Sequence, residues 1–249
     1  MMFSDTAAAI TGAGSGMGRA TARLFADRGA DVVVVDIDED AAEETVSLIG
    51  DEGGSAVAAA ADVSDADNVS GFVDQTVDEF GRIDMLHNNA GVAQESTPVE
   101  DVTEASWDRI HDVNLKSAFL GAKHAVPHMR KQGSGVILNT ASTAGIRPRT
   151  GLSAYCAAKG GLITLTKQLA YELATDGIRV NAICPVATDT SMLPQFSGDD
   201  LSVDDMLSTI PLGRLADPDD IAQAAAFLAS DEASMVTGTA LEVDGGRDI

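Results

Sequence analysis

The chain is poor in cysteine, aromatic residues and lysine, and it has no long apolar run. Its two cysteines, Cys156 and Cys184, stand in apolar segments, which favours small core residues over a disulfide. His124 and His128 lie one helical turn apart without a third ligand nearby, so we expect no metal site. No stretch of about 20 apolar residues occurs, so the sequence predicts no membrane span. The N-terminal residues lack a basic segment and a cleavage-type site, so we expect a cytoplasmic protein.

Basic residues are scarce: 16 Lys and Arg stand against 39 Asp and Glu, a net charge of -23. This balance excludes nucleic acid and anionic membranes as partners. Aspartate outnumbers glutamate 28 to 11, only five residues are lysine, and the acids are spread over the whole chain. Such a surface is typical of proteins from salt-loving microbes, in which self-repulsion is screened within a few Å. We therefore predict a halophilic protein, with an ordinary acidic protein as the alternative.

The first structural pattern is an apolar strand followed by glycines and an amphipathic helix. The apolar run at 7–11 leads into a glycine-rich turn at 12–18. Glycines let the backbone approach a pyrophosphate closely, and the helix N-terminus offers free N–H groups to it. The sequence therefore predicts a dinucleotide-binding site at this turn.

The second strand, residues 31–36, ends in an acid about 20 residues after the glycines. A carboxylate at Asp36 can accept hydrogen bonds from both ribose hydroxyls of the adenosine half of NAD, and it repels the 2′-phosphate of NADP. Ser15 agrees with this, because it puts no basic side chain in the glycine turn. We predict NAD as the cofactor; a solvent-exposed strand end is the alternative explanation of Asp36.

Strands and helices alternate along the rest of the chain, without a linker or repeat. This predicts one α/β domain over 1–249, a Rossmann-type, doubly wound parallel sheet of about seven strands with helices on both faces. Residues 188–210 are polar and rich in Asp, with a few apolar residues, and we expect them to form a substrate lid.

A long helix is predicted at 104–131, with Trp107, Ile110, Val113, Phe119 and Leu120 as its apolar stripe. Asn114 falls inside it. An asparagine side chain competes for backbone hydrogen bonds, so Asn114 either disturbs the helix locally or lies on a solvent face.

Tyr155 and Lys159 stand one turn apart on a further predicted helix, so a phenol and an ammonium would lie side by side. A cation at ~4 Å favours the phenolate by roughly 4 kcal/mol at an effective dielectric near 20, which is about three pKa units. We therefore expect Tyr155 to titrate near ~7 and to act as a general acid and base. Ser142 stands 13 residues earlier, just past a strand end, where open α/β sheets bind ligands.

Taken together, these motifs resemble those of the short-chain dehydrogenase/reductase family, in its compact one-domain branch. The similarity covers nearly all 249 residues and consists of a TGxxxGxG-like stretch at Thr11–Gly18, an NNAG stretch at 88–91, YxxxK at 155–159, and Asn114 and Ser142 at the other two catalytic positions. One departure is visible: the family often has Pro-Gly after the sixth strand, whereas this chain has Pro185 and Val186 in a loop that normally touches the nicotinamide.

The resemblance implies a role for each of these residues. Tyr155 exchanges the proton with the alcohol or carbonyl oxygen, while Lys159 lowers the pKa of Tyr155 and binds the nicotinamide ribose. Ser142 hydrogen-bonds the substrate oxygen. Asn114 holds a water that links Lys159 to solvent. The implied cofactor-binding positions are Gly12, Ser15, Gly16, Met17, Gly18, Asp36, Ile37, Asp62, Val63, Asn89, Tyr155, Lys159 and Thr188.

The resemblance also implies a homotetramer and a small alcohol or ketone substrate. Members of the family that reduce fatty-acid intermediates generally use NADPH and often carry Arg in the glycine turn, which Ser15 and Asp36 oppose. We therefore expect NAD-dependent oxidation of a secondary alcohol, such as a sugar or polyol. An NAD(P)H-dependent 3-oxoacyl reductase is the first alternative, and a catalytically silent NAD-binding sensor is a remote one.

Overall fold

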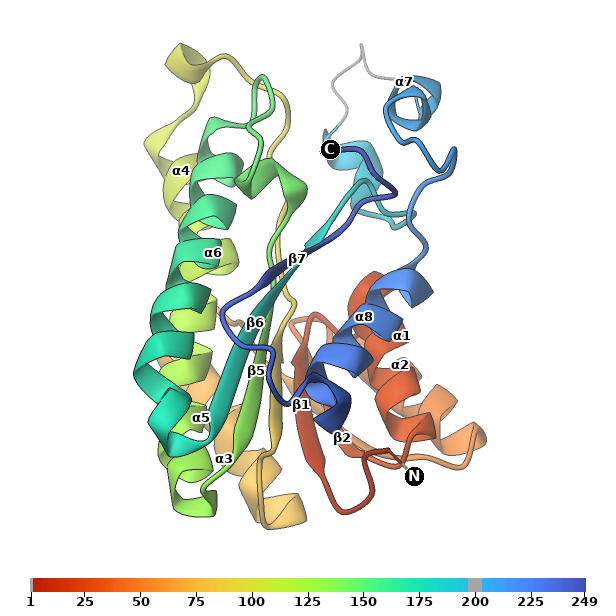
Figure 1. The fold of residues 1–249 in the computed structure, drawn as a ribbon, viewed down its shortest axis with the longest axis vertical. Helices are drawn as coiled ribbons and strands as arrows, with labels where there is room; N and C mark the ends of the chain where they lie inside the picture. Colours follow the sequence, from red (N-terminus) through yellow and green to blue (C-terminus); the bar gives the residue numbers. More distant parts are fainter. Residues whose placement is uncertain (1, 197–202) are drawn as a thin grey trace.

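The computed structural model describes residues 2–196 and 203–249, which build a seven-stranded parallel sheet between two layers of helices (Figure 1). The strands are β1 Ala7–Thr11, β2 Asp31–Asp36, β3 Ser55–Ala60, β4 Met85–Asn88, β5 Gly135–Thr140, β6 Ile178–Pro185 and β7 Ala240–Val243. Their order in the sheet is β3-β2-β1-β4-β5-β6-β7. The predicted Rossmann-type sheet is therefore confirmed. Because the strand order reverses between β1 and β4, a crevice opens at their carboxyl ends.

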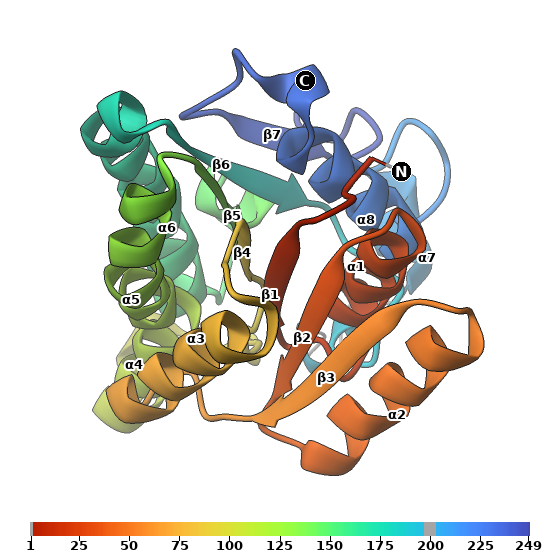
Figure 2. The same ribbon diagram turned by 90° about the horizontal axis from the view of Figure 1, so that it is seen from below.

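The helices divide between the two faces of the sheet (Figure 2). They are α1 Gly16–Asp27, α2 Glu39–Asp51, α3 Ala66–Phe80, α4 Glu104–His111, α5 Ser117–Gln132, α6 Ser153–Leu173, α7 Val203–Ser208 and α8 Pro218–Ala229. Short 3-10 helices lie at Val99–Asp101, Thr143–Gly145, Ala174–Asp176, Leu193–Phe196 and Asp231–Ala233. Helices α1 and α8 pack together on one face, and α3 and α5 pack together on the other.

Strand β2 shows why the sequence forms this layered fold. Its four valines are all fully buried, but they alternate between two cores because successive side chains of a strand point to opposite faces. Val32 and Val34 join the core beneath α1 and α8, whereas Val33 and Val35 join the core beneath α3 and α5. A strand buried on both faces reads as a continuous apolar run, which is typical of parallel sheets.

The predicted helix at 104–131 is in fact interrupted. A π-helix at Asp112–Lys116 separates α4 from α5, and Asn114 at its centre is 1% exposed. Its amide donates to the carbonyl of Ile110, four residues back, at 3.0 Å. Asn114 therefore disturbs the helix by taking a backbone acceptor, which is the first of the two expected explanations.

Three side chains predicted to be buried are not fully buried. Trp107 and Phe119, placed in the apolar stripe of that helix, are 41% and 50% exposed, and only Ile110 and Leu120 of that stripe are buried. Cys184 is buried as expected, but Cys156 is partly exposed. Within the described ranges, no helix is both long and apolar enough to cross a membrane.

The predicted site residues follow the strands at one edge of the sheet. The carboxyl ends of parallel strands meet at that edge, so residues far apart in the sequence are brought together there. In strand order the edge carries Asp62 after β3, Asp36 at the end of β2, the glycine turn after β1, Asn89 after β4, Ser142 after β5 and Thr188 after β6.

Candidate active site

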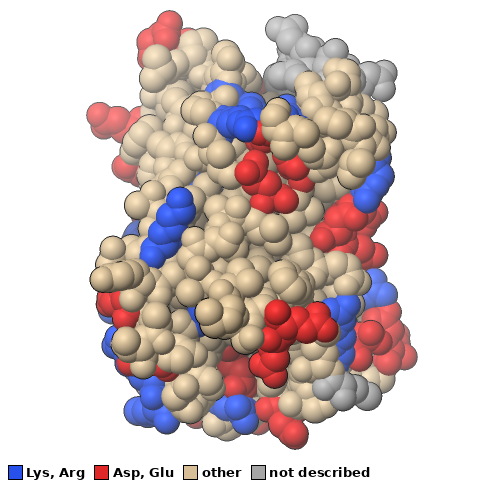
Figure 3. Space-filling model, viewed as in Figure 1, with Lys and Arg blue, Asp and Glu red and all other residues tan. Residues whose placement is uncertain are grey.

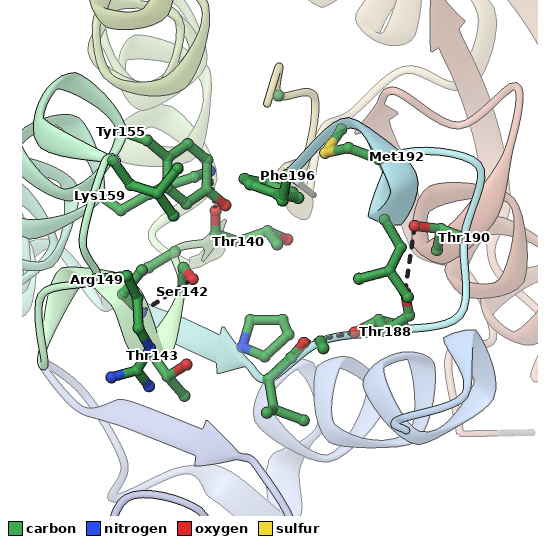
Figure 4. Close-up of a pocket in the computed structure, with 18 of the residues that line it drawn as sticks. Thr140, Ser142, Thr143, Arg149, Tyr155, Lys159, Thr188, Thr190, Met192 and Phe196 are labelled. Atoms are coloured by element: carbon green, nitrogen blue, oxygen red, sulfur yellow. Dashed lines mark hydrogen bonds between the residues drawn. The ribbon is translucent and has the colours of Figure 1, made fainter. Parts of the chain in front are cut away.

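A cavity of about 360 Å³ opens at the carboxyl ends of β4, β5 and β6 (Figure 4). It collects seven of the predicted site residues: Met17, Asn89, Asn114, Ser142, Tyr155, Lys159 and Thr188. The others lie outside it, along the ends of β1 to β3: Gly12, Ser15, Gly16, Gly18, Asp36, Ile37, Asp62 and Val63. The edge thus has two parts, the cavity and the surface beside it.

Helix α6 places Tyr155 and Lys159 against the floor of the cavity. Both are buried, with 8% and 3% of their surface exposed. The Lys159 ammonium donates to the carbonyl oxygen of Thr140 at the end of β5, at 2.7 Å. The backbone N–H of Tyr155 donates to Oε1 of Gln94 at 2.9 Å, and Gln94 is itself buried. The sequence analysis did not single out Gln94 or Thr140, because neither belongs to a recognisable motif. Gln94 acts through its side-chain amide, and Thr140 acts through its backbone carbonyl.

The expected effect of Lys159 on Tyr155 is wrong for this structure. The Lys159 Nζ atom lies 5.8 Å from the centre of the Tyr155 ring and donates to the Thr140 carbonyl. Burial raises the pKa of Tyr155 to about 12, and a hydrogen bond with Ser142 lowers it only in part. Burial also lowers the pKa of Lys159 to about 8. Desolvation dominates the pKa of both groups, so the phenol is protonated at neutral pH.

Ser142 stands where β5 gives way to a 3-10 turn. Its backbone is extended, and its Oγ accepts a hydrogen bond from the backbone N–H of Ala144 at 3.1 Å. A hydroxyl that accepts from the backbone still has its own hydrogen to donate. Ser142 and Tyr155 therefore direct two hydroxyl groups into one cavity, close enough to hydrogen-bond each other.

Asn114 reaches the cavity from the π-helix. Its Oδ1 accepts from the backbone N–H of Val92 at 3.2 Å, and its amide donates to the Val92 carbonyl at 3.0 Å. Gly91 separates it from Lys159: a Cβ at that position would lie 2.8 Å from Asn114 Oδ1 and 3.6 Å from Lys159 Nζ. These contacts fix the amide next to the ammonium, and they explain why no larger residue fits at position 91.

The glycine turn fits a closely approaching diphosphate. A Cβ on Gly18 would lie 2.1 Å from the carbonyl oxygen of Gly12, so only glycine lets α1 begin this close to the turn. Gly16 has φ +50°, a conformation that other residues rarely adopt. The turn ends at the N-terminus of α1, which presents free N–H groups. A nicotinamide dinucleotide therefore fits this part of the chain.

Asp36 is anchored beside that turn. Its Oδ2 accepts from the backbone N–H of Gly14 at 2.8 Å, and its Oδ1 accepts from that of Asp38 at 3.1 Å. The neighbouring Ile37 is 72% exposed, which leaves an apolar surface next to the carboxylate. The Asp36 carboxylate is therefore held beside the glycine turn by two backbone N–H groups.

Arg19 is a basic residue near the turn that the sequence argument overlooked. Its guanidinium donates to the Gly14 carbonyl, to Thr45 Oγ1 and to the carboxylate of Glu44. Glu44 and the carbonyl thus occupy much of its hydrogen-bonding capacity. The signal was present in the sequence, because Arg19 directly follows the last glycine of the turn.

A chain of polar side chains braces the floor between the two parts of the edge. The Asn89 amide donates to the Thr11 carbonyl at 3.0 Å, and the Thr140 hydroxyl donates to Asn89 Oδ1 at 3.1 Å. His87 Nε2 lies 2.9 Å from the same hydroxyl. His87 is buried within β4, as expected, and burial lowers its pKa to about 4. The imidazole is therefore neutral and ties β4 to β5.

Asp62 and Thr188, predicted to contact the adenine and the nicotinamide region, form hydrogen bonds with residues close to them in the sequence. The Asp62 carboxylate accepts from both the backbone N–H and the hydroxyl of Ser64, and Val63 is buried. Thr188 is buried, and its hydroxyl donates to the Val186 carbonyl at 2.9 Å. The Val186 N–H donates to Val243 of β7, so the chain runs on past β6 without the glycine that the resemblance led us to expect.

The far wall of the cavity comes from the predicted lid. Figure 4 shows Met192 and Phe196 across the cavity from Lys159 and Ser142. The Phe196 ring meets the Tyr155 ring edge-on, with 5.0 Å between their centres. Met206 also lines the cavity. Residues 197–202 of the predicted lid lie outside the described residues.

Comparison with known proteins agrees with this geometry. A family model described as enoyl-(acyl carrier protein) reductase matches residues 12–248. The chain is 42% identical to 4-formylbenzenesulfonate dehydrogenase of Comamonas testosteroni over 100% of both proteins. It is 42% identical to cis-4-hydroxycyclohexanecarboxylate dehydrogenase of Sinomonas cyclohexanicum, covering 98% of this chain and 97% of that protein.

A solved structure is similarly close. The structure of 3-ketoacyl-(acyl-carrier-protein) reductase from Brucella melitensis complexed with NADH superposes with a TM-score of 0.93 at 44% identity, over 99% of this chain and 100% of the other. Glycine turn, buried Tyr155 and Lys159, family model and full-length relatives all agree, and the chain belongs to the short-chain dehydrogenase/reductase family.

Proposed function

We propose that the chain is an NAD-dependent dehydrogenase that interconverts a secondary alcohol and its ketone. The observation that carries this proposal is the meeting of the Tyr155 phenol and the Ser142 hydroxyl in one cavity, with Lys159 buried beneath them. Two hydroxyl donors directed at one point suit a carbonyl or carbinol oxygen. A nicotinamide cofactor, when bound, supplies the hydride acceptor for such a substrate.

In this proposal each polar group of the cavity has one task. Tyr155 gives a proton to the carbonyl oxygen, or takes one from the alcohol, and its high pKa makes the neutral phenol the resting form. Ser142 donates to the same oxygen and stabilises the charge that develops on it. Lys159 is held by Thr140, and Asn114 lies beside it to bind the water of a proton path to solvent.

Asp36 supports NAD over NADP. Its carboxylate is fixed by two backbone N–H groups, so it cannot swing away from a 2′-phosphate without losing both hydrogen bonds. The residues that would hold the dinucleotide are the glycines of the turn, Asp36, Ile37, Asp62, Val63, Asn89, Lys159 and Thr188. Arg19 is a cation near the glycine turn, and Glu44 offsets its charge.

A ring-shaped secondary alcohol suits the apolar part of the cavity. Leu152, Val186, Leu193 and Phe196 form this part, against which the carbon atoms of a ring would pack. Relatives named for cyclohexanol and for hydroxycyclohexanecarboxylate support this substrate class.

A 3-oxoacyl reductase is the second candidate, because the similar solved reductase carries that name. Unless salt screens the charge, an acidic carrier protein would be repelled by a chain with a net charge of -23, and Figure 3 shows several separate groups of acidic side chains on the face drawn. A catalytically silent sensor is disfavoured, since Asn114, Ser142, Tyr155 and Lys159 are all present.

The test is turnover of a panel with NAD and with NADP: cyclohexanol, a polyol, and a 3-oxoacyl thioester with the reduced cofactors. We expect NAD-linked oxidation of the cyclic alcohol to dominate. Preferential NADPH-linked reduction of the thioester would replace the proposal by the second candidate, and no turnover of any compound would favour the sensor.

Four further features complete the proposed picture. The chain acts as a single domain with residues 188–210 as its lid, and it works in the cytoplasm of a halophile.

The chain assembles as a homotetramer through its long helices. The exposed Trp107, Phe119 and Tyr171, one on each of α4, α5 and α6, support that assembly. Light scattering in molar salt gives the mass, and a monomer would contradict it.

A further inference from the structure

Among the described residues that line the cavity, every charged side chain is cationic. They are Arg149, Lys159 and Arg247, and no Asp or Glu joins them. This contrasts with the chain as a whole, in which acidic residues outnumber basic ones by 39 to 16. Lys159 belongs to the catalytic floor. The two arginines come from separate segments, one after β5 and one after β7, and have no role in the proposed reaction.

The guanidinium of Arg247 is partly buried, and among the side chains that the structure describes it has no hydrogen bond and no ion pair in direct contact. Burial, followed by the positive charge of Arg149, lowers the pKa of Arg247, while the nearby carboxylates of Asp248 and Asp244 raise it in part, so the two guanidinium groups lie close enough to repel each other. An anion bound between them would relieve this repulsion and replace lost water.

Arg149 is fixed in place by a carboxylate outside the cavity lining. Its Nη2 donates to Asp248 Oδ1 at 3.0 Å, and the Asp248 side chain is only 3% exposed. The Asp248 backbone N–H in turn donates to Asp244 at 2.8 Å. Within the described chain, the Nε and Nη1 groups of Arg149 have no partner. Asp248 therefore positions the guanidinium and leaves part of its hydrogen-bonding face open.

The acidic residues of this corner act on the two arginines from outside the cavity. Glu242, Asp244 and Asp248 lie within 4.8 Å of one another, but none of them lines the cavity. Figure 3 shows basic and acidic side chains next to each other near the top of the drawn face, where Figure 1 places the C-terminus. In Figure 4 Arg149 lies near Ser142 and Thr143, with Tyr155 and Lys159 on the same side of the cavity.

We propose that Arg149 and Arg247 form an anion-binding subsite, and that the substrate is a secondary alcohol or ketone carrying a carboxylate or sulfonate away from the reacting carbon. This inference rests on the proposed function, because it names the substrate class of the same cavity. Guanidinium groups bind both kinds of anion through paired N–H donors. The carbinol would meet Ser142 and Tyr155, while the anion would meet the arginines.

The first experiment compares an acid with its neutral ester. Isomers of 4-hydroxycyclohexanecarboxylate and their methyl esters are oxidised with NAD at one fixed salt concentration. We expect kcat/KM for the best acid to exceed that of its ester by at least about tenfold. Arg247→Gln should lower kcat/KM of the acid by about tenfold or more, chiefly through KM, and leave the ester within about twofold. Equal use of acid and ester by the unaltered protein, or an equal loss for both in the variant, would overturn the subsite.

Two further variants separate recognition from folding. Arg149→Gln strands the buried Asp248, so it is combined with Asp248→Asn, which removes both charges together. The pair should also lose activity selectively on the acid. Arg147→Gln is the matched control, since Arg147 lies on the same loop, 3.7 Å from Asp248, but does not line the cavity. Arg147→Gln should leave kcat/KM unchanged for both acid and ester. A selective loss on the acid in this variant would show that long-range charge alone, and not contact with the arginines of the cavity, attracts the anion.

A binding experiment separates this inference from the proposed function. Cyclohexanecarboxylate and cyclohexanesulfonate, with cyclohexanol as the neutral probe, are added to the protein with NADH and the unfolding temperature is recorded. Either anion should raise it more than cyclohexanol does, and the gain should vanish in Arg247→Gln. Binding without any turnover would refute the dehydrogenase and keep the subsite. If neutral alcohols are turned over, but neither anion raises the unfolding temperature more than cyclohexanol does, the dehydrogenase stands and the subsite is refuted.

Discussion

The two parts of the carboxyl edge carry opposite charge. Beside the ends of β2 and β3 the chain presents Asp36 and Asp62, while the cavity beyond β5 and β6 is lined by Arg149 and Arg247. In the proposed function, the first part would repel the 2′-phosphate of NADP, and the second would attract an anionic substrate. The proposed edge would thus sort two ligands by charge, although the chain as a whole is strongly acidic.

Both parts are held by contacts between separate segments of the chain. In the cofactor part, Gly14 donates to Asp36, 22 residues away. In the cavity, Tyr155 donates to Gln94 and Arg149 donates to Asp248, across 61 and 99 residues. Changes at Asp36 should therefore alter cofactor choice, and changes in the cavity should alter chemistry and substrate.

The largest effect is expected from Tyr155→Phe. It removes only the hydroxyl and keeps the ring that contacts Phe196. Turnover should fall by about 10²–10⁴-fold, because the proton donor is lost, while NAD affinity stays within about twofold. Steady-state kinetics and calorimetric titration measure the two quantities. Turnover above a tenth of the original would remove Tyr155 from its assigned role.

Gly18→Ala should disrupt the glycine turn of the cofactor part. The added Cβ would lie 2.1 Å from the Gly12 carbonyl, so we expect a loss of about 2–4 kcal/mol in the free energy of unfolding and weaker NAD binding. Gly71→Ala is the matched control, because no atom lies within 4 Å of its Cβ on helix α3. That substitution should stabilise the chain by about 0.5–1 kcal/mol. Urea unfolding of both variants makes the measurement, and equal stability would show that the turn has room.

Asp36→Ser should weaken the charge contrast itself. Removing the carboxylate should lower the preference for NAD over NADP by about 10–100-fold, which is about 1.4–2.8 kcal/mol. Arg19 lies near enough to the turn to favour the added phosphate. Asp40→Ser, an exposed acid on α2 with the same charge change, is the control and should leave the preference unaltered. An effect as large in the control would mean that net charge decides cofactor choice.

The smallest effect concerns the buried cation of the cavity. The pKa of Lys159 is lowered from 10.5 to about 8, so between these pH values the unfolded chain binds a proton that the folded chain does not. Folding stability should therefore rise with pH over this window, and below it the buried charge should carry its full cost. Between pH 8 and 10 the rise in the original protein should exceed that in Lys159→Met by roughly 1–2 kcal/mol. Parallel curves from urea unfolding would contradict the lowered pKa.

The sequence predicted the parts of the molecule that depend on local patterns. The four buried valines of β2 and the glycines before α1 determine a parallel sheet with a dinucleotide turn, and the spacing of Tyr155 and Lys159 places both on one helix face. The interruption at Asn114 was one of two expected outcomes, since an interior asparagine competes for backbone groups.

Burial and long-range neighbours could not be predicted in this way. The pKa of Tyr155 was misjudged because sequence spacing gives a neighbour but not its distance, the depth of burial or the pull of the Thr140 carbonyl on Lys159. Arg149 and Arg247 stand almost 100 residues apart in unremarkable loops, and only the fold brings them to one cavity.

The most direct test of the charge contrast is a calorimetric titration of the unaltered protein with NAD and with NADP at one salt concentration. The account predicts that NAD binds at least tenfold tighter, about 1.4 kcal/mol, because Asp36 is fixed where the 2′-phosphate would lie. Equal or tighter binding of NADP would contradict the account and would make the 3-oxoacyl reductase the better explanation of this chain.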